Sequence, residues 1–218
     1  MVLLIITIDG PAGSGKSTVA KALAKRLGFR YIDTGAFYRA FTCKAMRAGA
    51  DLEDEGNLCK LVKETDIRVE DGQEGIRVLV DGEDVTREIR DPAVTERVHF
   101  IASLAKVREP LVERQRAAAE GVDAVAEGRD TGTVVFPHAD RKFYLYAQPE
   151  ERARRRYAEL RPDNKGLNYE GILEDIRRRD RRDSTREASP LRIGPDFISL
   201  DTTGLDVEEV VERLLQKI

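Results

Sequence analysis

Gly10-Pro11-Ala12-Gly13-Ser14-Gly15-Lys16-Ser17 matches the phosphate-binding pattern G-x-x-x-x-G-K-[S/T] without a gap. Residues 2–8 before it are almost all apolar, as in a strand that is buried on both faces. Residues 18–27 after it place their apolar side chains on one helical stripe, and Gly28 follows where a helix commonly ends. A strand, a glycine-rich loop and a helix in this order are the context that the pattern requires. We therefore predict a phosphate-binding loop.

The residue types of this loop suit the phosphates of a nucleotide. Its glycines let the backbone turn N–H groups inward, and the helix N-terminus adds partial positive charge. Lys16 is predicted to reach the outer phosphates, and the Ser17 hydroxyl to coordinate Mg²⁺. A glycine-rich turn without a ligand is the alternative, but it gives no reason for the lysine or the serine.

Composition narrows the class of protein. The 218 residues suffice for one substantial domain, and the 37 basic and 40 acidic residues leave a formal charge of −3. This charge argues against general nucleic-acid binding but not against a local basic site. Cys43 and Cys59 have the spacing of neither a zinc site nor a disulfide framework. The apolar run at residues 2–8 is too short to span a membrane, so we expect a cytoplasmic protein.

The rest of the chain mostly alternates strands with helices. This order predicts a parallel sheet that helices cover on both faces. Short alternating runs at residues 67–69 and 76–80, bordered by Asp-Gly pairs, predict antiparallel hairpins instead. We interpret residues 62–103 as an insertion on the α/β core. Expected strands are at 29–32, 122–126, 142–147 and 197–200, and expected helices at 36–48, 55–64, from 91, 107–119, 149–160, 169–183 and 207–218.

Three loops that follow predicted strands, at residues 9–17, 33–39 and 127–132, are expected to converge at the carboxyl edge of the sheet. Asp33 and Thr34 are candidates for this site or for a helix cap. Arg39 lies near the start of the helix expected at 36–48, where its charge opposes the helix dipole. An anion in front of Arg39 would explain this position better than solvent. Arg129 can bind a phosphate through two hydrogen bonds, and Asp130 can accept hydrogen bonds from the amino group of a base. The alternative is that these two residues form a polar turn with a surface ion pair.

The C-terminal third is rich in arginine. Twelve arginines lie between Arg152 and Arg192, and Arg179, Asp183 and Arg186 share one helical face if the helix continues that far. Part of this charge is expected to form surface ion pairs. The remaining guanidinium groups are candidates to surround transferring phosphates.

At this point the sequence resembles the bacterial cytidylate kinases of the nucleoside-monophosphate kinase group. The resemblance includes the phosphate loop, Asp-Thr-Gly-Ala-Phe-Tyr-Arg-Ala at 33–40, and Ala-Glu-Gly-Arg-Asp-Thr-Gly-Thr-Val-Val-Phe-Pro at 126–137. It continues through Val107-Arg108, Gln115-Arg116 and the blocks at 149–156 and 179–184, and so runs the length of the chain. It implies a single P-loop kinase domain over 1–218, with a central parallel sheet, a small antiparallel insert on the CMP side at about 62–103, and a short Arg-rich lid at about 155–170.

The resemblance also implies a reaction and residue roles. Such an enzyme transfers phosphate from ATP, with Mg²⁺, to CMP or dCMP. By this resemblance the donor site would comprise residues 10–17 with Thr18, Arg152 and Arg156. Asp33 belongs to the implied acceptor site, where Thr34, Arg108 and Asp130 surround the base, Arg39 and Arg129 hold the phosphate, Arg179 and Asp183 contact the ribose, and Arg186 lies between the phosphates. Lys16, Arg129, Arg179 and Arg186 are the implied catalytic residues. His99 stands where many relatives have serine.

Other classes remain as alternatives. A GTPase-type switch needs Asn-Lys-x-Asp, but the sequence at residues 164–167 lacks the aspartate. A nucleic-acid-binding protein could use the Arg-rich helices, although the net charge speaks against it. Among kinases, the alternative acceptor is UMP or another nucleoside monophosphate. We expect small-molecule substrates, no nucleic-acid or membrane partner, and a monomer.

Overall fold

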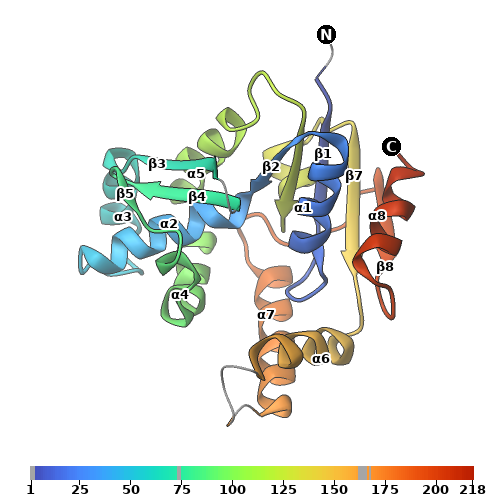
Figure 1. Ribbon diagram of the computed structural model, residues 1–218. Helices are drawn as coiled ribbons and strands as arrows, with labels where there is room; N and C mark the ends of the chain where they lie inside the picture. Colours follow the sequence, from blue (N-terminus) through green and yellow to red (C-terminus); the bar gives the residue numbers. More distant parts are fainter. Residues whose placement is uncertain (1–2, 73–74, 162–165, 167) are drawn as a thin grey trace.

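The central element of the computed structural model is a parallel sheet with the strand order β2-β6-β1-β7-β8. The structure describes residues 3–72, 75–161, 166 and 168–218. The central strand β1 pairs with β6 on one side and β7 on the other, all in parallel. This confirms the predicted parallel sheet, whose arrowheads point towards α6 and α7 in Figure 1. The strands are β1 Ile5–Asp9, β2 Arg30–Asp33, β6 Ala124–Gly128, β7 Arg141–Tyr146 and β8 Phe197–Asp201.

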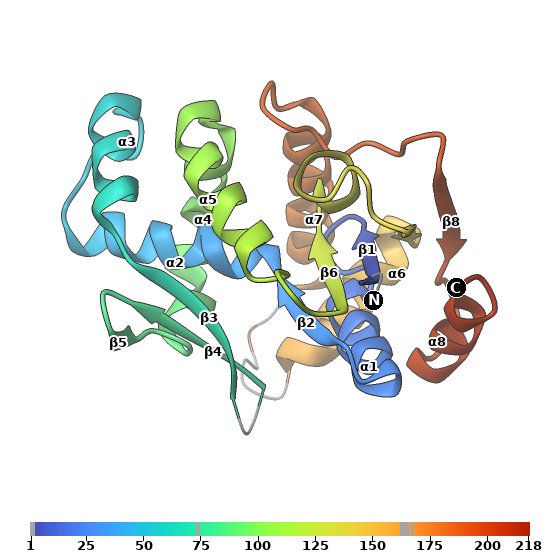
Figure 2. The same ribbon diagram turned by 90° about the horizontal axis from the view of Figure 1, so that it is seen from above.

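Helices cover both faces of this sheet. Alternate residues of β6 enter different hydrophobic clusters, because successive side chains of a strand point to opposite faces. Val125 joins the cluster beneath α1 and α8, whereas Ala124 and Ala126 join the cluster that includes α2 and α5. Figure 2 shows α1 and α8 on the same side of the sheet. The helices are α1 Lys16–Leu27, α2 Thr34–Arg47, α3 Glu55–Glu64, α4 Pro92–Ser103, α5 Ala105–Ala117, α6 Pro149–Leu160, α7 Tyr169–Thr185 and α8 Val207–Leu215.

The predicted antiparallel segment is present as a second, small sheet. It has the order β3-β4-β5, and it consists of β3 Ile67–Gly72, β4 Gly75–Val80 and β5 Glu83–Asp84. Val78 and Val80 of β4 are buried in the same cluster as Phe37 and Phe41 of α2. A short 3-10 helix, η1 Glu88–Arg90, then leads to α4. This sheet and its neighbouring helices lie to one side of the central sheet (Figure 2).

Several boundaries differ from those expected. α2 begins at Thr34 rather than residue 36, because the Asp33 side chain accepts a hydrogen bond from the Ala36 N–H at 3.0 Å. α5 begins at Ala105, two residues earlier than expected. A π-helix, η2 Thr131–Val135, was not predicted. The expected lid at 155–170 falls partly on residues 162–165 and 167, which lie outside the described residues. Within the described ranges, no helix combines the length and the apolar character needed to cross a bilayer.

Candidate active site

The phosphate loop joins β1 to α1 at the carboxyl edge of the sheet, as predicted. Gly13 has φ +76°, a left-handed conformation that favours glycine. A Cβ atom at Gly10 would collide with the Leu145 carbonyl, so this position also accepts no side chain. Gly15 precedes α1 and provides no side-chain cap, unlike Asp33 before α2. The first turn of α1 thus suits an anion.

Lys16 is buried beside this loop. Its side chain is 9% exposed, and Nζ lies 3.9 Å from Glu127 Oε2. Nζ also donates a hydrogen bond to the Pro11 carbonyl at 3.4 Å. Burial, together with the charge of Arg129, lowers the pKa of Lys16 to about 8, although Glu127 acts in the opposite direction. The ammonium group therefore lies where water screens its charge weakly.

Glu127 is a further residue of this site, and the sequence alone did not predict a role for it. It is buried at the end of β6, and Oε1 accepts hydrogen bonds from Ser17 Oγ at 2.7 Å and Tyr31 Oη at 3.2 Å. The available signal was an acidic residue directly after the strand expected at residues 122–126. Sequence reasoning gave it no role because nothing local shows that β6 and the phosphate loop are neighbours.

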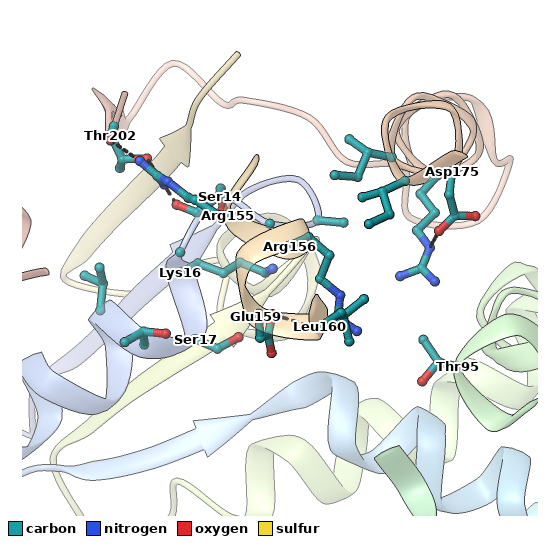
Figure 3. A pocket seen from close by; sticks show the side chains of 18 of the residues that line it. Ser14, Lys16, Ser17, Thr95, Arg155, Arg156, Glu159, Leu160, Asp175 and Thr202 are labelled. Carbon is teal, nitrogen blue, oxygen red and sulfur yellow. Dashed lines mark hydrogen bonds and ion pairs between the residues drawn. The ribbon is translucent and has the colours of Figure 1, made fainter. Parts of the chain in front are cut away.

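A cleft of about 1120 Å³ opens in front of the phosphate loop. The loop forms one wall, α6 and α7 another, and α4 and the segment after β8 complete it. Figure 3 shows Lys16 and Ser17 on the loop side, Arg156 on α6, and Thr95 of α4 opposite Asp175 of α7. The predicted arginines that line this cleft are Arg39, Arg129, Arg156 and Arg179. Residues from distant parts of the sequence thus meet at one opening.

A second charged cluster lies deeper, beside the start of η2. The buried side chains of Arg108 and Asp130 form an ion pair, and Arg186 Nη2 lies 3.6 Å from Asp130 Oδ1. The Arg108 guanidinium also lies 4.9 Å from the centre of the Tyr38 ring. The predicted base-binding pair Arg108 and Asp130 is thus in contact, and Arg186 adjoins it.

Arg129, which follows β6, pairs with an acidic residue of α7. Arg129 Nε donates to Asp183 Oδ2 at 2.8 Å. Burial alone would raise the pKa of Asp183, but Arg129 holds it below the ordinary value.

Near the end of β2, Arg39 donates to Asp33 at 2.7 Å. Thr34 Oγ1 donates to the Glu127 carbonyl at 2.8 Å. These contacts connect α2 and α7 to the end of β6.

Arg152 occupies a different place from the cleft-lining arginines. It is 3% exposed and donates to the carbonyls of Ala12 at 2.9 Å and Ala147 at 2.8 Å. It also forms two hydrogen bonds with Asp180, at 3.0 and 2.6 Å. Arg152 therefore ties α6 to the phosphate loop and to α7. Arg155, which the sequence analysis did not select, lines the cleft and donates to Thr202 Oγ1 at 3.1 Å.

Other arginines of α6 and α7 form surface ion pairs, as expected for part of them. Arg154 pairs with Glu151, Arg177 with Glu150, and Arg178 with Asp175, and all three guanidinium groups are more than half exposed. Exposed pairs of this kind contribute little to stability.

Asp9, the last residue of β1, is fully buried behind the phosphate loop. Its two carboxylate oxygens accept backbone N–H groups at the start of η2, from Thr131 at 2.9 Å and Gly132 at 2.8 Å. Burial raises the pKa of Asp9 to about 6, although these two hydrogen bonds lower it. A pKa raised from 3.8 to about 6 corresponds to a cost of about 3 kcal/mol for keeping this carboxylate ionised at neutral pH.

Comparison with known proteins agrees with this arrangement. The family described as cytidylate kinase matches residues 6–218. A cytidylate kinase of Caldanaerobacter subterraneus subsp. tengcongensis is 52% identical over 213 residues, which cover 98% of this chain and 93% of that protein. The cytidylate kinase of Bacillus subtilis (strain 168) is 46% identical over 215 residues, which cover 99% and 96%.

Among solved structures, a shikimate kinase from Bacteroides thetaiotaomicron covers 100% of both chains at a TM-score of 0.51 and 16% identity, a likeness of fold alone. The sequence relatives also show the family, because they match the chain over nearly its whole length at about 50% sequence identity. The chain therefore belongs to the cytidylate kinase family.

Proposed function

We propose that this chain transfers the γ-phosphate of ATP to CMP, and also to dCMP, giving ADP and CDP or dCDP. The observation that carries the proposal is that a phosphate loop and a second set of arginines line the same cleft. A nucleoside-triphosphate hydrolase needs only the first of these. The membership of the cytidylate kinase family gives the acceptor its identity.

The donor is MgATP, which residues 10–18 hold by its phosphates. Lys16 neutralises charge on the outer phosphates from a buried position. Ser17 Oγ and the Glu127 carboxylate, 2.7 Å apart, are oxygen groups of the kind that Mg²⁺ prefers. The described residues contain no group of three or more His, Cys, Asp or Glu side chains that would hold a metal ion. Arg156 flanks the donor from α6, and Arg152 supports the loop from behind.

The acceptor lies towards α2, α5 and η2. Asp130 accepts a hydrogen bond from the cytosine amino group, and Arg108 orients this carboxylate. Uracil has a carbonyl at that position, which an ionised carboxylate repels, so the pair favours CMP over UMP. Arg39 and Arg129 exchange part of their contacts with Asp33 and Asp183 for the acceptor phosphate. Arg179 and Asp183 serve the ribose.

The reaction requires positioning more than proton transfer. An oxygen of the acceptor phosphate forms the new bond to the γ-phosphorus, and the bond from that phosphorus to the β-bridging oxygen breaks. The attacking oxygen is already anionic, so no general base is needed. Lys16, Arg129, Arg179 and Arg186 stabilise the charge spread over the transferring oxygens.

A coupled assay of ADP release over a panel of nucleoside monophosphates tests the proposal. CMP and dCMP should be the fastest acceptors, and Asp130→Ala should raise the KM for CMP by about 10- to 100-fold while the KM for ATP stays within about twofold. Asp51→Ala, which removes an exposed carboxylate far along the chain from this cluster, is the control. No ADP release with CMP, or faster release with a purine monophosphate, would show that the proposed acceptor is wrong.

A further inference from the structure

Asp9 has no part in the mechanism described above, although it is the residue directly before the phosphate loop. It is fully buried, and its carboxylate is not among the groups that line the cleft. Both of its oxygens are instead committed to the backbone N–H groups of Thr131 and Gly132, which lie 122 and 123 residues further along the chain.

These N–H groups open the first turn of η2. The first N–H groups of a helix have no partner within the helix, so a side chain or solvent must accept their hydrogen bonds. A residue next to the helix usually does so, as Asp33 does for α2. Here no local side chain caps η2, and the cap comes from the end of β1.

The capped turn fixes the residue before it. The Asp130 carbonyl accepts hydrogen bonds from the N–H groups of Val134 at 2.8 Å and Val135 at 3.2 Å. The N–H group of the next residue, Thr131, donates to the Asp9 carboxylate. The backbone that carries the Asp130 carboxylate is therefore held against β1. A Cβ atom at Gly132 would come within 2.7 Å of both Thr7 Oγ1 and the Phe197 ring, so the turn has little room to shift.

We propose that Asp9 is a positioning residue of the acceptor site, which fixes the Asp130 carboxylate at a set place relative to the phosphate loop. The inference rests on the proposed function, because it takes Asp130 as the group that meets the acceptor base. Asp9 is bonded to Gly10 in the chain, and its side chain accepts hydrogen bonds from η2. One side chain therefore fixes the position of the acceptor segment relative to the donor loop.

Asp9→Asn tests this inference at nearly constant volume. The amide oxygen can still accept one N–H group, but the amide NH₂ then faces the other N–H donor, and the turn must shift. We expect the KM for CMP to rise about tenfold or more, as for one lost hydrogen bond to a charged group. The KM for ATP should stay within about twofold, and the preference for CMP over UMP should fall, because it depends on where Asp130 lies.

Asp123→Asn is the matched control. Asp123 Oδ1 also accepts a backbone N–H, from Leu4 at 2.6 Å, but it does so next to the amino ends of β1 and β6. This variant should lower the melting temperature without separating the two KM values. A change of both KM values by the same factor in Asp9→Asn, or no change in the preference for CMP over UMP, would overturn the inference.

Gly132→Ala provides a second variant if Asp9→Asn does not fold. Its new methyl group would meet Thr7 and Phe197 and displace the same turn, so it should produce the same selective rise in the KM for CMP. Equal effects on the two substrates would again overturn the inference. The unmodified enzyme separates this inference from the proposed function. If it phosphorylates CMP but the variants show no selective effect, the role of Asp9 is wrong; if it does not phosphorylate CMP, the proposed function is wrong.

Discussion

At the scale of single residues, burial decides how Lys16 behaves. Its pKa is lowered to about 8, so the free enzyme loses the ammonium charge on the alkaline side of neutrality. Because kcat/KM reports the free enzyme, kcat/KM for ATP should fall as pH rises through about 8, by roughly tenfold per pH unit above it. Initial rates at low ATP across a pH series measure this.

Lys16→Arg is the control for this prediction. A guanidinium group keeps its charge at every pH in such a series, so the variant should be less active but should lack the alkaline decline. A wild-type profile that stays flat through this range would contradict the lowered pKa.

The place of a candidate site residue in the fold could be predicted where a local motif contains it. The phosphate loop, Arg39, Arg129 and Asp130 follow strands and sit in dense, specific patterns, and the structure places them around one edge of the sheet. The role of Glu127 depends on β6 lying next to β1, and the cap that Asp9 forms depends on a contact across more than 120 residues. Neither has a local signal, so sequence reasoning could not assign them.

At the scale of elements, Arg152 joins three parts of the site. It holds the phosphate loop at Ala12, the start of α6 at Ala147, and α7 at Asp180. Arg152→Met should cost about 2–3 kcal/mol of unfolding free energy, since Asp180 is 27% exposed and regains some water. It should also raise the KM for ATP. Thermal or urea unfolding, together with initial rates, measures both effects.

Arg154→Met on the same helix is the matched control, because the Arg154 side chain is 71% exposed and, within the described part of the chain, forms its ion pair with Glu151. It should change stability by less than about 1 kcal/mol. If both variants are equally stable, Arg152 does not tie these elements together.

Most elements were predicted within a few residues because periodicity and caps are local. Asp33, Asp91 and Gly28 mark helix ends by their own chemistry. Two exceptions lack such a local signal. The five residues of η2 carry no periodic pattern, and their first N–H groups depend on Asp9. The start of α5 lies after an apolar residue, Leu104, that makes no side-chain cap.

At the scale of the whole molecule, two sets of basic residues approach one cleft from different elements. The proposed donor and acceptor positions are separate, so CMP and a non-hydrolysable ATP analogue should stabilise the fold independently. Each should add about 2.7 kcal/mol at 100 times its dissociation constant. Thermal shift with each ligand alone and with both measures the sum.

Lys16→Ala should lose most of the stabilisation by the ATP analogue and keep that by CMP. If one ligand abolishes the effect of the other, they share a position and the two-nucleotide arrangement is wrong.

The central place of β1 also affects how the chain is made. Its strand partners are β6 and β7, and Asp9 precedes Ala124 by 115 residues. At a synthesis rate of about 5–20 residues per second, roughly 6–23 s pass between the synthesis of β1 and that of β6. The apolar segment around Ile6 and Ile8 has no strand partner during this time. A nascent chain with this topology carries an unpaired apolar strand until β6 has been synthesised. Its yield in cells should therefore depend on chaperones that shield this strand.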